Sequence, residues 1–211
     1  MQSIKEISWE VLPIEAPLYI KKCSKCKVSN QFYCSNKFRM NNQKKNSDVW
    51  LIYKCLECDN TFNITIHSRT KAHSIEKISY EKYINNDPEE ALRLSLDTDV
   101  INRNHIQVDF SSIEYEIKAS QEIYLKDMIF LDEDIVQIYI SYPFNLNLKL
   151  SKIIRKQLNI SLNELSYMIE EDILTISNTE NWKRDKVKDS ATVMINREKL
   201  CSYILNTKKT I

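Results

Sequence analysis

Two cysteine pairs with the same two-residue gap constrain this chain more than any other feature of its sequence. Cys23 and Cys26 form the first pair, Cys55 and Cys58 form the second, and 28 residues separate the pairs. A two-residue gap lets both thiolates of a pair point at one ion, and two such pairs complete a tetrahedral shell of four sulfurs. We therefore expect these four cysteines to bind one structural Zn²⁺ per chain.

Two alternatives remain open for the four thiols, a redox dithiol and an iron–sulfur cluster. A hydrolytic zinc is not expected, because four thiolates leave no open position for a water nucleophile. The other two cysteines, Cys34 and Cys201, stand alone in the sequence. Isolated cysteines of this kind are more often buried apolar side chains than ligands.

Residues rich in β-branched and aromatic side chains surround both cysteine pairs. The expected strands are 18–20, 31–40, 48–53 and 62–66, with a polar turn at 41–47. Together with the four cysteines, this order of strands resembles a zinc ribbon over roughly residues 15–70.

The chain contains no glycine. A P-loop, a Rossmann phosphate turn, an EF-hand loop and the nucleophile elbow of an α/β-hydrolase all need glycine, so these sites are excluded. Zinc knuckles usually place glycine after the second cysteine, where the backbone turns left-handed, but here Lys27 and Asp59 occupy those positions. We expect left-handed backbone at both residues, at a cost of about 1 kcal/mol or more each.

Charge is unevenly distributed along the chain, although the net charge is only +1. Residues 1–74 have 12 basic and 6 acidic side chains, residues 75–147 have 6 and 15, and residues 148–211 have 12 and 8. We take these segments as three domains: a zinc ribbon, an acidic α+β connecting region and a carboxy-terminal domain. The two basic ends either face a polyanion such as a nucleic acid or are ordinary solvated surfaces.

The acidic middle segment is expected to contain short helices over 75–104 and strands at 108–118 and 135–142. Asp87, followed by a proline and two glutamates, is a strong helix start. The acidic run 132–134 lacks the ligand spacing of a cation site, so we expect a solvated loop there.

A pair of helices is expected in the carboxy-terminal segment. Residues 148–158 have one apolar stripe, and the opposite face has four basic residues and no acid; these are Lys149, Lys152, Arg155 and Lys156. Ser161, with Glu164 three residues later, forms a capping box that opens the second helix. Short strands are expected at 173–176 and 193–195.

This order of elements resembles the S4-like RNA-binding domain over residues 147–196. Lys149-Leu150-Ser151-Lys152 aligns with the start of that family's first helix, and Leu158-Asn159-Ile160-Ser161-Leu162 with the start of its second. Leu162 stands where the family has an arginine, and Asp172 where it has a glycine. The resemblance implies a small α+β domain that contacts RNA through Lys149, Lys152, Arg155, Lys156 and Ser161.

Over most of its length the chain is also similar to a bacterial family known as domain of unknown function 1062. The similarity rests on Trp9-Glu10 and on the segments 48–55, 63–66, 80–83 and 85–87. The name of this family implies no activity.

Taken together, these features predict an α+β, non-catalytic, zinc-containing RNA-binding protein, associated with the ribosome or another structured RNA. A second RNA contact is expected around the first cysteine pair, at Lys21, Lys22, Lys25 and Lys27. The alternative is a protein-interaction adaptor that docks a partner through the ribbon's strand edge or its aromatic residues, which are Phe32, Tyr33, Phe38 and Trp50.

An RNA-modifying enzyme is a third interpretation, which we do not favour because no segment is left for a catalytic domain. No small-molecule substrate is evident. The longest apolar run has five residues, at 49–53, and the first 13 residues lack the apolar stretch of a signal peptide. We therefore expect a cytoplasmic protein without a membrane partner.

Overall fold

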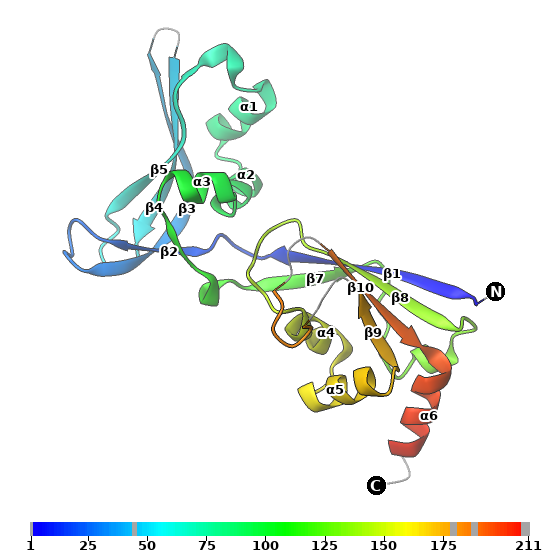
Figure 1. Cartoon of the computed structure of the whole chain (residues 1–211). Helices are drawn as coiled ribbons and strands as arrows, with labels where there is room; N and C mark the ends of the chain where they lie inside the picture. The colour runs from blue at the N-terminus through cyan, green and yellow to red at the C-terminus, as the bar shows by residue number, and fades with distance from the viewer. Residues whose placement is uncertain (1, 44–45, 178–180, 187–189, 208–211) are drawn as a thin grey trace. The chain divides into compact units, whose positions relative to one another are not determined.

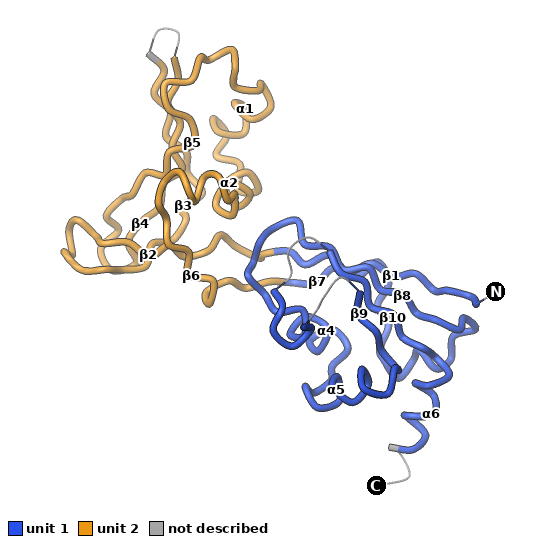
Figure 2. Tube along the Cα trace, in the orientation of Figure 1, with its two compact units in different colours: residues 1–12, 116–211 blue, residues 13–115 orange. Residues whose placement is uncertain are grey.

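The computed structural model describes residues 2–43, 46–177, 181–186 and 190–207. Helices and strands are both well represented, which confirms the expected α+β class. The chain forms two compact units (Figure 2): unit 1 contains residues 1–12 and 116–211, and unit 2 contains residues 13–115. Unit 2 is therefore an insertion, in sequence, between the first strand of unit 1 and the rest of it.

These units differ from the three segments that charge distribution indicated. The helices expected over 75–104 belong to unit 2, with the cysteine pairs, whereas the strand expected at 135–142 belongs to unit 1. The acidic middle segment is thus divided between the two units.

Unit 2 is built on a five-stranded antiparallel sheet with the strand order β5-β4-β3-β2-β6 (Figure 1). Its strands are β2 (Leu18–Lys22), β3 (Ser29–Gln43), β4 (Asn46–Cys55), β5 (Thr61–Lys71) and β6 (Gln107–Asp109). The four strands expected around the cysteine pairs lie within β2 to β5. Within the expected polar turn at 41–47, residues 44–45 lie outside the described part of the chain.

Three short helices pack on this sheet, namely α1 (Lys77–Asn85), α2 (Pro88–Ser95) and α3 (Thr98–Arg103), after the 3-10 turn η1 (Ala72–Ser74). The start of α2 is as expected, because the Asp87 side chain accepts a hydrogen bond from the Glu90 backbone N–H. Tyr19 of β2 stacks on Tyr53 of β4 with ring centroids 4.0 Å apart, and the Tyr19 hydroxyl donates to the Ser95 carbonyl. This contact fixes the end of α2 to the sheet.

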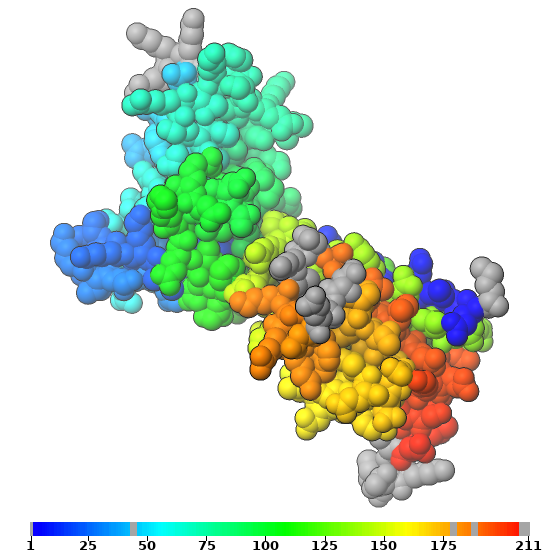
Figure 3. Space-filling model, viewed as in Figure 1, coloured from blue at the N-terminus to red at the C-terminus, as the bar shows by residue number. Residues whose placement is uncertain are grey.

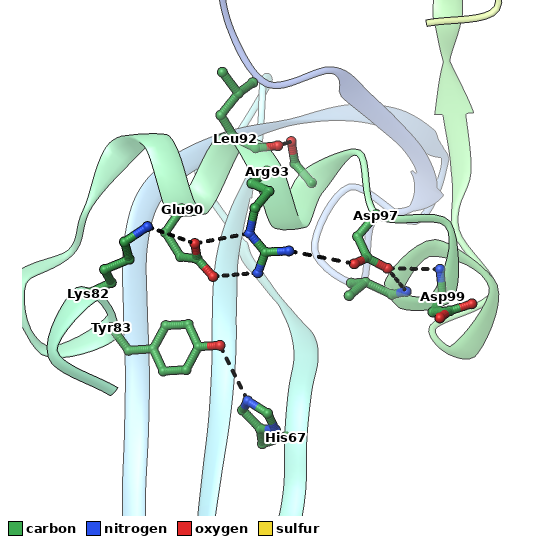
Figure 4. Close-up of polar contacts among 10 residues, drawn as sticks. His67, Lys82, Tyr83, Glu90, Leu92, Arg93, Asp97 and Asp99 are labelled. Atoms are coloured by element: carbon green, nitrogen blue, oxygen red, sulfur yellow. Dashed lines mark hydrogen bonds and ion pairs between the residues drawn. The ribbon is translucent and has the colours of Figure 1, made fainter. Parts of the chain in front are cut away.

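A charged network joins the three helices of unit 2 (Figure 4). Glu90 of α2 is only 3% exposed. The Arg93 guanidinium donates to both carboxylate oxygens of Glu90. The Lys82 ammonium of α1 lies 3.4 Å from Glu90 Oε2. Arg93 also lies 3.9 Å from Asp97, whose carboxylate caps α3. Since a buried carboxylate is stable only when paired, Glu90 ties α2 to its neighbours.

Unit 1 is built on a mixed five-stranded sheet with the order β7-β1-β8-β10-β9. Its strands are β1 (Ile4–Pro13), β7 (Tyr115–Ala119), β8 (Ile135–Ser141), β9 (Leu174–Ser177) and β10 (Ser190–Asn196). β1 pairs with β8 in parallel, whereas β10 pairs antiparallel with β8 and β9. Alternate residues of β1, β8 and β10 are fully buried, so one face of the sheet lies in the core.

The helices of unit 1 are α4 (Leu150–Leu158), α5 (Leu162–Glu170) and α6 (Arg197–Thr207), with a 3-10 turn η3 (Met128–Phe130) beside α6. The expected order of two helices followed by two strands is observed. Asn159 ends α4 in the left-handed conformation, and the predicted capping box of Ser161 and Glu164 opens α5. β9 and β10 pair with each other as expected.

The single strand expected at 108–118 is wrong. The chain forms β6, then a 3-10 turn η2 (Phe110–Ser112), then β7. The reason is Asp109, whose carboxylate accepts hydrogen bonds from the backbone N–H and the hydroxyl of Ser111 and so turns the chain. β6 then pairs with β2 in unit 2, whereas β7 joins the sheet of unit 1.

The acidic run 132–134 has a structural role that its sequence did not indicate. The Asp134 carboxylate accepts hydrogen bonds from the backbone N–H and the hydroxyl of Ser3. These bonds hold the start of β1 against the residue that precedes β8, where the parallel pairing of the two strands begins.

Left-handed backbone is provided without glycine. Nine described residues have positive φ, and six of them are Asn or Asp, the non-glycine types that tolerate this conformation best. Lys27, Asp59 and Asp172 have φ of 66°, 55° and 53°. The three positions where the resembled folds place glycine are therefore left-handed, as expected.

No helix within the described ranges is long and apolar enough to cross a bilayer.

Candidate metal centre and nucleic-acid interface

The four paired cysteines lie on two similar turns at one end of the unit 2 sheet. In the first turn, the Cys23 N–H donates to the Val28 carbonyl and the Lys27 N–H donates to the Cys23 carbonyl. In the second, the Cys55 N–H donates to the Asn60 carbonyl and the Asp59 N–H donates to the Cys55 carbonyl. The two turns have the same hydrogen-bond pattern, residue for residue, so they present their cysteine pairs in the same way.

The four sulfurs converge. The possible ligand atoms of Cys23, Cys26, Cys55 and Cys58 all lie within 4.8 Å of one another. Cys23 Sγ and Cys58 Sγ are 3.6 Å apart, close to the edge of about 3.8 Å of a tetrahedron with Zn–S bonds of ~2.3 Å. These four cysteines, alone among the six, can together hold a metal ion in the part of the chain that the structure describes.

The electrostatics of the cluster favour a bound cation. The backbone N–H of Cys26 lies 3.4 Å from Cys23 Sγ and lowers the pKa of that thiol to about 6. The neighbouring Cys58 thiol raises the pKa of Cys26 to about 12. Full ionisation of four such close thiols therefore requires a positive charge among them, which a divalent metal supplies.

Polar contacts connect the two cysteine turns to each other and to the sheet. The Asn60 side-chain amide donates to the Ser24 hydroxyl at 3.0 Å, across the two turns. The Tyr33 hydroxyl of β3 donates to the Asp59 carboxylate at 2.9 Å, and the Leu56 N–H donates to the Gln31 carbonyl. The site is therefore prearranged by contacts outside its sulfur ligands.

The two remaining cysteines lie outside the cluster. Cys34 is half-buried on β3 beside Tyr53, and its burial raises the pKa of the thiol to about 11. Cys201 of α6 is also half-buried, with its sulfur 4.0 Å from the Ile129 carbonyl. Neither position offers a ligand to the metal site.

The basic face expected on the first carboxy-terminal helix is present on α4. Leu150, Ile153, Ile154 and Leu158 are buried, whereas Lys149, Lys152 and Lys156 are exposed. Arg155 is half-buried, and its Nε has no hydrogen-bond partner among the described residues. α4 has no acidic residue in its first turn, so positive charge gathers at its amino-terminal end.

The remaining positions of the S4-like motif have defined local contacts. The Ser161 hydroxyl accepts the Glu164 N–H, and the Ser161 N–H donates to the Glu164 carboxylate, so this serine is engaged as a helix cap. Leu162 is 42% exposed and leaves an aliphatic surface where the resembled family has a cation. The Asp172 carboxylate lies 3.8 Å from the Lys199 ammonium.

The lysines around the first cysteine pair are not equivalent. All four of these lysines, Lys21, Lys22, Lys25 and Lys27, are exposed, but Lys21 has a ring contact. The Lys21 ammonium lies 3.6 Å from the centre of the Phe62 ring, and partial desolvation there lowers the pKa of this lysine. Lys21 is therefore held against its own protein in a cation–π contact.

One of the four aromatic residues named for partner docking, Phe32, is buried: it is 1% exposed and makes an edge contact with Phe62. Phe38 is half-buried and packs on Tyr83 with ring centroids 5.0 Å apart. Tyr33 is engaged with Asp59, and Trp50 is half-buried on β4. The open edge of β5 is partly covered by Asn104, whose side chain bonds both the N–H and the carbonyl of Thr65.

Sequence reasoning missed one basic segment, residues 181–186, which form a closed turn beside the amino terminus of α4. Lys149 and Lys186 form an isolated antiparallel bridge, and the Leu150 N–H donates to the Asp185 carbonyl at 3.3 Å. The signal that could have found this turn is the string Trp182-Lys183-Arg184, an aromatic residue followed by two cations. Its position beside α4 is a tertiary contact that no local pattern indicates.

The family comparison covers the middle two thirds of the chain, from within β3 to the segment after β9. The family described as "Protein of unknown function (DUF1062)" matches residues 40–180, so the chain belongs to this family. The matched range includes the second cysteine pair, the helices of unit 2 and both α4 and α5. Comparison with curated proteins and with solved structures found no match.

Proposed function

We propose that this protein is a non-catalytic, cytoplasmic RNA-binding protein whose unit 2 holds one structural Zn²⁺ in a zinc-ribbon-like site. In this proposal the α4 face of unit 1, with Lys149, Lys152, Arg155 and Lys156, contacts RNA phosphates. Lys22, Lys25 and Lys27 supply a second and weaker contact in unit 2, to which Lys21 adds its charge.

Zinc is the metal that best suits the four-cysteine cluster. Thiolate ligands at tetrahedral separations select zinc or iron–sulfur chemistry over calcium or magnesium. A closed shell of four protein ligands is typical of a structural ion, since a catalytic zinc keeps a position for water. A reducing compartment such as the cytoplasm keeps the thiols available for the metal.

RNA binding rests on one observation, the concentration of exposed cations on the solvent face of α4, whose other face is buried. Phosphate contacts supply most of the sequence-independent affinity of such proteins for nucleic acid. The order of α4, the capped α5, β9 and β10 matches the elements of the S4-like resemblance, which implies RNA as the polyanion. The buried apolar residues of α4 anchor the helix in the core, so these cations are held on a rigid element.

The test is a double charge reversal, Lys149→Glu with Lys152→Glu, measured by fluorescence anisotropy with a labelled, structured RNA over a range of salt concentrations. We expect weaker binding and a salt slope smaller by about two, because two phosphate contacts are lost. The matched control is Lys118→Glu with Lys126→Glu, which makes the same charge change at two exposed lysines of unit 1 outside α4. Equal affinity in the wild type and the α4 variant would contradict this interface.

The alternative function, a protein-interaction adaptor, is favoured by the exposed part of the β5 edge and by Trp50. A purified protein that shows no RNA affinity at low salt and co-purifies with one stoichiometric protein partner would support the adaptor. Co-purified nucleic acid that salt removes would support RNA binding instead.

A further inference from the structure

We propose that the turn 181–186 and the amino-terminal end of α4 form one composite site for an unpaired nucleotide segment of RNA, with the Trp182 indole stacking on a base. This inference rests on the proposed RNA-binding function and specifies the kind of RNA that the α4 face takes.

The turn has a defined conformation. The Arg184 and Asp185 N–H groups both donate to the Asn181 carbonyl, at 2.9 and 2.8 Å, and the Asn181 N–H donates to the Asp185 carboxylate at 2.8 Å. The acidic side chain of the turn is thus engaged with the backbone. Lys183, Arg184 and Lys186 are exposed, so the outer surface of the turn is basic.

Backbone contacts hold this turn next to the basic face of α4. The bridge between Lys149 and Lys186 and the hydrogen bond from the Leu150 N–H to the Asp185 carbonyl join the two segments where α4 begins. In Figure 3 the turn is at the surface of unit 1, in orange, near the yellow helices. Lys149 and Lys186, which come from distant parts of the chain, are therefore paired. The two adjoining segments also have Lys152, Lys183 and Arg184 as exposed cations.

Trp182 favours single-stranded RNA over duplex RNA as the ligand. Trp182 is half-buried, and the Lys183 ammonium lies 5.1 Å from the centre of its ring. An indole within a basic patch is the arrangement by which proteins bind single strands, since every base has a face for stacking while the cations contact the flanking phosphates. The bases of a duplex are stacked on each other and offer no such face, so an unpaired segment is the better ligand.

The experiment measures the affinity of the full-length protein for two labelled probes, a 12-nucleotide single-stranded RNA and a blunt RNA duplex of the same length. We expect tighter binding of the single strand. Trp182→Ala should weaken that binding about 10-fold with little change in the salt slope, whereas Trp182→Phe should retain most of the affinity. The single strand should also quench tryptophan fluorescence in the wild type and much less in Trp182→Phe.

Three outcomes separate the two proposals. Loss of affinity in Trp182→Ala, with rescue by Trp182→Phe, supports the composite site. Unchanged single-strand affinity in Trp182→Ala, together with weaker binding in the α4 charge reversal, would overturn the composite site and leave the proposed function standing. No affinity of the wild type for either probe at low salt would overturn both. Hydrogen exchange of α4 in each variant reports whether unit 1 remains folded.

Discussion

The two units of this protein are stabilised in different ways. In unit 2 the core contains the cysteine cluster, a stacked tyrosine pair and the paired carboxylate of Glu90. In unit 1 most of the buried strand and helix residues are aliphatic, and the other large buried side chains include Trp9 of β1 and Met128 of η3. We therefore expect the stability of unit 2 to respond to metal removal and to acid, and that of unit 1 to respond to cavities in its hydrophobic core, and each expectation can be tested separately.

Metal removal should have the largest effect, and only on unit 2. Cys55→Ser with Cys58→Ser removes half of the sulfur shell, and structural zinc sites contribute on the order of 10 kcal/mol to folding. We expect the wild type to contain about one zinc per chain by elemental analysis and the variant to contain none. Hydrogen exchange should show faster exchange in β2 to β5 of the variant.

The control for this prediction is Cys34→Ser with Cys201→Ser, which removes two thiols outside the cluster and should retain the metal. Protection of β1, β8 and β10 should be the same in both variants, because these strands belong to unit 1. Full zinc content in Cys55→Ser with Cys58→Ser would disprove the metal site.

A cavity in the core of unit 1 should destabilise unit 1 and leave unit 2 unchanged. Ile138 on the central strand β8 is fully buried, and its replacement by alanine removes three carbons and leaves a void. Ile138→Ala should lower the free energy of unfolding of unit 1 by about 3 kcal/mol, measured by urea denaturation. Zinc content and hydrogen exchange in unit 2 should stay unchanged. Tyr139→Ala, at the exposed neighbouring position, is the matched control and should change stability much less.

The Glu90 network should make unit 2 less stable as the pH falls into the acidic range. Hydrogen bonds from Arg93 hold the pKa of the Glu90 carboxyl below its usual range. A folded pKa below the unfolded value of about 4.3 stabilises the fold above that pH. This contribution is lost as the pH falls through the folded pKa. Arg93→Gln leaves Glu90 with Lys82 alone and should cost about 2 kcal/mol at pH 7.

The difference between wild type and Arg93→Gln should shrink as the pH falls below about 4, as followed by thermal unfolding of unit 2 at a series of pH values. Arg39→Gln, at an exposed arginine of β3, is the control for loss of one cation. A pH-independent difference would show that Arg93 acts through packing and not through the charge of Glu90.

The smallest expected effect is a gain in thermal stability on replacing Lys27. Lys27 has φ of 66°, which a residue with a Cβ adopts at a cost of about 1 kcal/mol. Lys27→Gly should therefore raise the melting temperature of zinc-loaded unit 2 by a few degrees. Asn159→Gly, at the left-handed end of α4 in unit 1, should give a smaller gain, because asparagine already tolerates this backbone. A loss of stability in Lys27→Gly would show that the lysine side chain stabilises the turn.

The features that sequence predicted are those with local causes. The spacing of the cysteines, the Asp87 and Ser161 caps, the stripe of α4 and the left-handed Lys27, Asp59 and Asp172 each depend on a few neighbouring residues. Apolar and polar residues alternate along the strands of the ribbon-like region because one face of their sheet is buried.

The features that sequence missed depend on contacts between distant residues. Nothing near Ile4 indicates that β1 pairs with β8, and nothing near Lys186 indicates its bridge to Lys149. The break between β6 and β7 had a local signal in Asp109, but the two sheets that the strands join had none. Phe32, one of the aromatic residues assigned to docking, was misjudged for the same reason, since its burial comes from packing within unit 2.

The parallel pairing of β1 with β8 has a consequence for the order of folding during synthesis. β1 leaves the ribosome before unit 2, yet its partner residues at 135–141 follow only after all of unit 2 has been made. Within unit 2, β2 to β5 pair with strands that are close in sequence, whereas β6 returns to β2 from the far end of the unit. Domains generally fold as units as they emerge. The strands and helices of unit 2 can therefore form while β1 still lacks its partner β8, and the sheet of unit 1 can close only after β10 has been synthesised.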